Sequence, residues 1–160
     1  MSTIATATVL SIGSLEALRD AAKPTKGLFG GSRDRFHDYL KRHGVELPAF
    51  EGQGYVLVTL LCFLEERGID LMSSEHADLA KALASTRGTT FFILSDTVKT
   101  SHLKSLDASS FTPDELRSYY EAFNETEASG VESVMLEGIR FLIKALGSAA
   151  ADKVVILEIG

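Results

Sequence analysis

The sequence predicts an α+β fold in a single domain (residues 1–160), with about seven helices packed on a small sheet of about three strands. Three observations lead to this prediction. A chain of 160 residues with 45% hydrophobic and 24% charged residues has the length and composition of one globular domain. Seven segments carry helical spacing or a helix cap, whereas three are short runs rich in β-branched or aromatic residues. The two kinds do not alternate regularly, which favours α+β.

The N-terminal part of the chain contains one predicted strand and two predicted helices. Residues 3–12 are rich in β-branched residues and alternate loosely, as a first strand would. A short helix should begin after Ser14, which can cap it, and should end at Pro24. A second helix should begin after Ser32. The residues that share one face of this second helix are Phe36, Tyr39, Leu40 and His43.

Residues 55–64 contain no charged side chain, so a membrane anchor, a cavity lining and a core element are all open interpretations. Val56, Val58 and Thr59 favour a strand, whereas the length of the run and the charged end at 65–68 favour a helix. Ten residues of helix span about 15 Å, half the hydrocarbon thickness of a bilayer. We therefore expect a buried central helix.

The middle of the chain is predicted to alternate between helix and strand. Ser73 or Ser74 should cap a helix, and residues 89–94 should form a buried strand. Ser95 or Asp96 should then start a further helix.

The strongest local signal in the sequence begins at Thr112. Threonine can cap a helix, Pro113 suits the first helical position, and Glu115 can return a hydrogen bond to the cap. Residues 131–146 then form a long helix with one polar stripe, and residues 153–159 form a closing strand.

The C-terminal half contains the segments FILSDTVKTSHLKSL, FTPDELRSYYEAFN and DKVVILEIG, and the chain starts with a threonine-rich strand followed by SLEALRD. This arrangement, strongest from residue 91 onward, resembles the YfbM-like family of small bacterial proteins of unknown function. The resemblance implies an α+β domain of the bacterial cytoplasm with no established activity. Members tend to carry a tryptophan and a histidine in the helix that corresponds to residues 55–64, and this sequence has neither there.

Composition and charge exclude several classes of function. A net charge of −6 argues against nucleic-acid binding, which needs a basic surface. No run approaches the length of a membrane-spanning helix, and no basic start typical of a secretory signal is present, so we expect a cytoplasmic protein. Cys62 is the single cysteine, so no intramolecular disulfide forms, and we expect this thiol to be buried. The four histidines show no metal-binding spacing, and we expect no metal and no cofactor.

The segment GLFGGSRDR is a candidate anion-binding site. Its candidate ligand-binding residues are Gly30, Gly31, Ser32, Arg33 and Arg35. Glycines allow backbone N–H groups to approach a phosphate, and arginines pair with its oxygens. The spacing matches neither a P-loop nor a dinucleotide-binding turn, so a connector into a capped helix explains the same residues.

The segment 107–132 is a candidate protein-binding surface, because it carries seven acids against one arginine together with aromatic side chains. The candidate residues are Tyr119, Glu121, Glu125 and Glu127. No nucleophile motif or opposed carboxylate pair points to catalysis. The favoured hypothesis is therefore a non-enzymatic protein-binding module, for example an immunity protein that neutralises a basic partner. The alternative is a protein or enzyme that binds an anionic small molecule at the loop 30–35.

Overall fold

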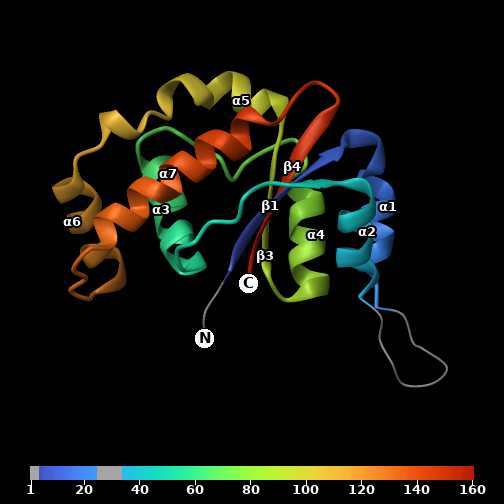
Figure 1. The fold of residues 1–160 in the computed structure, drawn as a ribbon, viewed down its shortest axis with the longest axis horizontal. Helices are drawn as coiled ribbons and strands as arrows, with labels where there is room; N and C mark the ends of the chain where they lie inside the picture. The colour runs from blue at the N-terminus through green and yellow to red at the C-terminus, as the bar shows by residue number, and fades with distance from the viewer. Residues whose placement is uncertain (1–3, 25–33) are drawn as a thin grey trace.

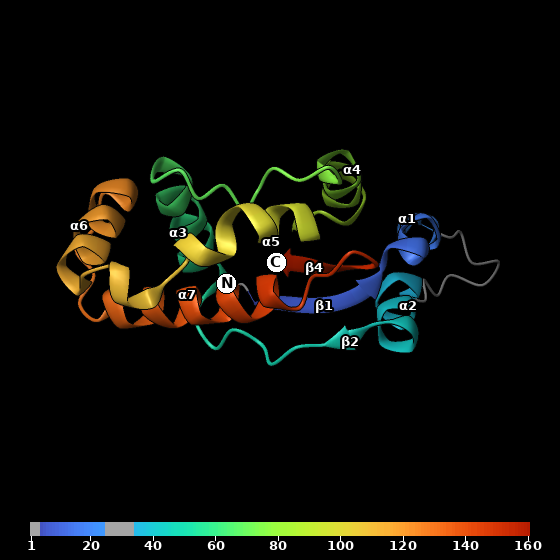
Figure 2. The same ribbon diagram turned by 90° about the horizontal axis from the view of Figure 1, so that it is seen from above.

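The computed structural model of this chain describes residues 4–24 and 34–160. Within these ranges, seven α-helices and four strands form one α+β domain (Figures 1 and 2). The strands form one antiparallel sheet in the order β2-β1-β4-β3. Their bounds are β1 (Ala5–Ser11), β2 (Val45–Glu46), β3 (Thr90–Leu94) and β4 (Lys153–Ile159). The predicted fold class is confirmed, with β2 as a strand that the sequence analysis did not include.

The long pairing of β1 with β4 decides which side chains share a face of the sheet. Thr6 lies opposite Glu158, Thr8 opposite Ile156, and Leu10 opposite Val154. Because successive side chains of a strand point to opposite faces, these residues form one face, and the positions between them form the other.

One face of the sheet is apolar between the strand ends and belongs to the larger of two cores. Ala5, Ala7, Val155 and Leu157 on this face are fully buried. The helices whose side chains complete this core are α3 (Gly54–Glu66), α5 (Asp96–His102), α6 (Pro113–Asn124) and α7 (Val131–Gly147). Residues 55–64 thus lie in a buried helix, as expected, with Leu57, Leu60 and Leu64 completely enclosed.

The other face of the sheet is apolar along only part of its length. Leu10, Ile93 and Ile156 pack in a second core with α1 (Leu15–Ala22), α2 (Arg35–His43) and α4 (Ala77–Arg87). Figure 1 places these three helices together on the side of the sheet away from α3, α6 and α7. Farther along the same face, Thr6 and Glu158 replace the apolar residues, and they line a pocket instead of a core.

The two predicted caps with the clearest chemistry are confirmed. Ser95 accepts a hydrogen bond from the backbone N–H of Val98 at the start of α5. Thr112 and Glu115 form the reciprocal pair of bonds of a capping box at the start of α6, with Pro113 in the first helical position.

The remaining predictions of helix starts and caps were right in part, wrong, or fall outside the described residues. α1 begins directly after Ser14, as predicted. Ser14 makes no capping hydrogen bond, because a 3-10 turn (Ile12–Ser14) leads directly into α1. Neither Ser73 nor Ser74 caps α4, which begins later, at Ala77; the Ser74 hydroxyl instead accepts a hydrogen bond from the N–H of His76. Ser32 lies outside the described ranges, and Asp34 is the residue that caps α2.

Two further findings concern the apolar segments. In the part of the chain that the structure describes, no helix is long and apolar enough to cross a membrane.

Cys62, expected to be buried, is half-buried on α3, and burial together with Glu65 and Glu66 raises the pKa of its thiol.

Candidate functional site

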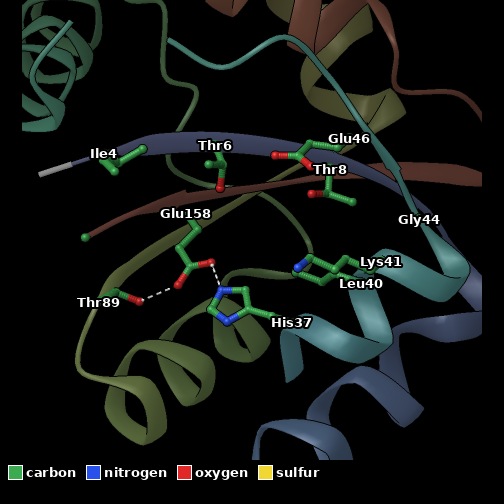
Figure 3. A pocket seen from close by; sticks show the side chains of 11 residues that line it. Ile4, Thr6, Thr8, His37, Leu40, Lys41, Gly44, Glu46, Thr89 and Glu158 are labelled. Atoms are coloured by element: carbon green, nitrogen blue, oxygen red, sulfur yellow. Dashed lines mark hydrogen bonds and ion pairs between the residues drawn. The ribbon is translucent and has the colours of Figure 1, made fainter. Parts of the chain in front are cut away.

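A pocket of about 490 Å³ opens on the polar part of the sheet, between the sheet and α2 (Figure 3). Its size falls in the range of pockets that hold small molecules. The residues that line it are Ile4, Thr6, Thr8, His37, Leu40, Lys41, Gly44, Glu46, Thr89, Glu158 and Gly160.

The floor of the pocket follows from the alternation of β1 and β4. Thr6 and Thr8 point to the same face as Glu158, and Figure 3 shows their hydroxyl groups turned toward the cavity. Neither hydroxyl makes a hydrogen bond with any residue in the described ranges. Two hydroxyl groups in the floor are therefore available to a ligand.

A close approach of backbone to sheet forms one wall. A Cβ added to Gly44 would lie 2.5 Å from the Thr8 methyl group and 2.8 Å from the carbonyl oxygen of Leu40. Such distances are too short for a real side chain. Gly44 thus lets the end of α2 lie directly over β1 at one side of the pocket.

His37 joins the inner wall to the floor. Its Nε2 lies 3.0 Å from Glu158 Oε2, and its Nδ1 lies 2.7 Å from Asp34 Oδ2. The Thr89 hydroxyl donates to the other oxygen of Glu158 at 3.1 Å. Figure 3 shows the contacts of Glu158 with His37 and Thr89 at the inner end of the cavity.

Arg87 completes this network through its contact with Asp34. Its guanidinium group donates to Asp34 at 2.8 Å and lies over the Phe36 ring, 4.8 Å from the ring centre. The group then consists of two carboxylates, one arginine and one histidine, namely Asp34, Glu158, Arg87 and His37. With His37 protonated, its charges cancel.

The pKa shifts in this network favour the charged forms. Burial lowers the pKa of His37, but the hydrogen bonds with Asp34 and Glu158 outweigh burial and raise it above its usual value. Burial likewise raises the pKa of Asp34, but the hydrogen bonds from Arg87 and His37 outweigh it and bring the pKa well below the usual value. Each ring nitrogen of His37 thus lies within hydrogen-bonding distance of a carboxylate, and Nδ1 also lies 3.3 Å from the Arg87 guanidinium group, so both nitrogens already have partners in the protein.

The rim of the pocket adds two charges of opposite sign. Lys41 on α2 and Glu46 on β2 are exposed, and neither forms an ion pair or hydrogen bond with the rest of the described chain. Figure 3 shows the Glu46 carboxylate beside Thr8 and the Lys41 amino group directed toward the cavity.

The candidate anion-binding residues do not take part in this pocket as far as they are described. Gly30, Gly31, Ser32 and Arg33 lie outside the described residues. Arg35 is exposed at the start of α2 and lies beside a separate shallow hollow, on the α1 side of the helix. The structure thus leaves the hypothesis of an anion site at this loop untested.

The candidate protein-binding residues lie on α6 and directly after its C-terminal end, and two of them are held by hydrogen bonds. The Tyr119 hydroxyl donates to Glu66 at 2.8 Å, and a Glu121 oxygen accepts from the N–H of Ala128 at 3.1 Å. Burial, with the Glu66 carboxylate, holds the pKa of Tyr119 far above its usual value. Glu125 and Glu127 are exposed.

Sequence reasoning missed His37 and Glu158 as members of one site. One signal was present: after Lys153 at its start, β4 is apolar except for Glu158, which is a single acid within a mostly buried strand. The partner on α2 is 121 positions away and has no sequence signal of its own.

Searches for metal sites and for relatives gave no match. Among the described residues, no group of three or more histidine, cysteine, aspartate or glutamate side chains could hold a metal ion. No family model matches the chain, and neither a curated protein nor a solved structure does. The YfbM-like resemblance therefore stays a prediction.

Proposed function

We propose that this protein binds a small molecule in the pocket between α2 and the polar part of the sheet. The observation that carries this proposal is the polar floor: Thr6 and Thr8 present hydroxyl groups that bond to no other described residue to a cavity of about 490 Å³. Polar groups that line a cavity without partners are the usual means by which a binding site orients its ligand. This proposal keeps the small-molecule alternative of the sequence analysis but moves its site away from the loop 30–35.

The arrangement supports binding rather than catalysis. A general base needs a free acceptor atom, and both ring nitrogens of His37 are engaged by carboxylates. A hydroxyl nucleophile needs a neighbouring base, and among the described residues no histidine nitrogen lies within hydrogen-bonding distance of the Thr6 or Thr8 hydroxyl group.

The test is retention of a ligand by the purified protein. The protein is incubated with the small-molecule filtrate of a bacterial cell extract, passed through a gel-filtration column, denatured, and analysed by mass spectrometry. We expect a small molecule to be retained in proportion to the protein. Thr6→Phe should abolish retention, because the ring fills the floor of the pocket while keeping a residue type that suits a strand.

Thr90→Phe is the matched control, since Thr90 is an exposed strand residue outside the pocket. It should retain the same molecule as the wild type. If the wild type retains nothing, or if Thr6→Phe retains as much as Thr90→Phe, the proposal is wrong.

A second candidate function is protein binding through α6, the function favoured by the sequence. The specific observation is that Phe123 is 50% exposed and stacks on Tyr119, with 5.8 Å between ring centres, next to the exposed acids Glu125 and Glu127. Exposed aromatic groups rimmed by charge are typical of protein interfaces, and acids would attract a basic partner.

Charge reversal tests this second candidate. We expect Glu125→Lys with Glu127→Lys to weaken the capture of a basic partner protein, with a smaller difference at high salt. A variant with Glu16→Lys on α1, far along the chain, is the control. Equal capture by all three proteins would contradict an interface at α6.

A further inference from the structure

We infer that the ligand of the pocket is a small zwitterion, that is, a free amino acid or a short peptide with charged amino and carboxyl groups. This inference rests on the proposed function, because it specifies the chemistry of the molecule that the same pocket holds. It follows from the sign, position and pairing of the charges that line the cavity.

The charges of the inner wall are already paired with one another. Glu158 is bonded to His37 and Thr89, and His37 is bonded in turn to Asp34. Arg87 balances Asp34. A ligand that displaced the partners of Glu158 or Arg87, whose side chains are 13% and 22% exposed, would leave a mostly buried charge unpaired, which is costly. The inner wall therefore favours an uncharged part of the ligand.

The charges of the rim are of opposite sign and have no ion-pair partner among residues 4–24 and 34–160. Lys41 projects from α2, and Glu46 projects from the short edge strand β2, so that the two come from different elements at the mouth. An ammonium group of a ligand can donate to Glu46, and a carboxylate can accept from Lys41. One molecule that carries both groups satisfies both residues.

The remaining lining is suited to the body of such a molecule. The hydroxyl groups of Thr6 and Thr8 can hydrogen-bond to amide or carboxyl groups, whichever way these point. Ile4 is 58% exposed although it is large and apolar, and it lines the cavity together with Leu40. An apolar side chain of the ligand that covered Ile4 would remove this surface from water.

The same lining disfavours a polyanion. Within the described lining, Glu46 and Glu158 are two carboxylates, whereas Lys41 is one cation without an ion pair to another described residue, and like charges in a shared site repel. Phosphate sites use arginine forks or helix N-termini, whereas the cavity is lined by no arginine among the described residues, and the C-terminal half of α2 contributes Leu40 and Lys41 to it. The anionic ligand expected for the loop 30–35 thus does not suit this pocket.

The test uses an enzymatic digest of casein, a mixture of amino acids and short peptides, as the probe. One portion is left untreated, a second has its amino groups acetylated, and a third has its carboxyl groups amidated. Retention by the protein is measured by gel filtration and mass spectrometry. We expect components of the untreated digest to be retained, and their treated counterparts to be retained roughly fivefold more weakly, the loss expected for one ion pair.

Two rim variants identify which charge binds which group. Lys41→Gln should weaken retention of the untreated digest and should no longer distinguish it from the amidated portion. Glu46→Gln should likewise no longer distinguish the untreated from the acetylated portion. Lys144→Gln and Glu137→Gln, exposed residues of α7 outside the pocket, should behave as the wild type.

The outcomes separate this inference from the proposed function. The proposed function stands if the bacterial filtrate yields a ligand that Thr6→Phe does not retain. The inference of a zwitterionic ligand is nevertheless wrong if the untreated digest is not retained, or is retained no better than its treated portions. If neither mixture yields a ligand, the proposed function fails and this inference fails with it.

Discussion

His37 and Glu158 meet across 121 positions of the chain, with Nε2 of the histidine 3.0 Å from Oε2 of the glutamate. The contact joins α2 to β4. These elements otherwise share the second core through Leu40 and Ile156. Because Asp34 holds the other ring nitrogen, the imidazole is fixed between two carboxylates. The inner wall of the pocket therefore depends on the protonation of one side chain.

This dependence predicts a pH effect on stability. The pKa of His37 is raised in the folded protein above the unfolded value of about 6.5. Its contribution to folding is then fully present below about pH 6.5 and is lost as the pH rises through the folded pKa. We expect the free energy of unfolding, measured with urea, to fall from about pH 6 to pH 8.

The variant His37→Gln should show a smaller fall over the same pH range, because its side chain does not titrate. His43→Gln is the control. His43 lies near the end of the same helix and stacks on Tyr39, with 4.3 Å between ring centres. It should keep the pH dependence of the wild type. If His37→Gln also keeps it, the network does not carry the effect.

A second prediction concerns the close packing of α3 against α7. A Cβ added to Gly138 would lie 2.8 Å from a terminal methyl group of Leu60, which is completely buried. Gly138→Ala should therefore lower the free energy of unfolding by about 1–3 kcal/mol, although alanine favours helix. Gly147→Ala in the same helix, with open space around its Cβ, should instead raise it by about 0.5 kcal/mol.

The pairing of Gly138 with Leu60 has its own test. Gly138→Ala combined with Leu60→Ala should lower the free energy of unfolding by less than the sum of the two single changes. Shortening Leu60 makes room for the methyl group added at position 138, and this methyl group fills part of the space that Leu60 leaves. Additive losses in urea unfolding would show that the two side chains do not compete for one space.

The parts of the fold that sequence predicted are those with local causes. The helix at residues 54–66 follows from its length and apolar surface, and the capping box of Thr112 and Glu115 needs only neighbouring residues. β2 was missed because Val45–Glu46 is too short to show any period, and it exists only through pairing with β1. Local chemistry predicts local structure; this strand is set by tertiary contacts.

The candidate site was less predictable for the same reason. Thr6 and Thr8 look like ordinary strand residues until β4 places Glu158 beside them. The position of His37 depends on α2 lying over the sheet, which in turn depends on Gly44. The glycine-rich loop was noticed because its signal is local, whereas the pocket is assembled from four separate segments of the chain.

A third prediction concerns the start of α6. Thr112→Ala removes the side-chain acceptor for the N–H of Glu115 and should lower the free energy of unfolding by about 1 kcal/mol. Thr86→Ala is the control, because the Thr86 hydroxyl bonds to a carbonyl four residues earlier within α4 and caps nothing. It should change stability by less than about 0.5 kcal/mol. Equal losses from the two changes in urea unfolding would contradict a role for the cap.

The last prediction concerns the end of α6, where Glu125 has a φ of 50°. This left-handed conformation costs a non-glycine residue about 1 kcal/mol because its Cβ crowds the following carbonyl oxygen. Glu125→Gly should therefore raise the free energy of unfolding by about 0.5–1 kcal/mol, since glycine has no Cβ. Glu127→Gly is the control, an exposed glutamate without positive φ, and it should give no gain. Equal effects of the two changes on the urea midpoint would mean that the strained backbone does not limit stability. If only Glu125→Gly raises the free energy of unfolding, the protein keeps a less stable helix end at α6. This is the surface at which the second candidate function places a protein partner.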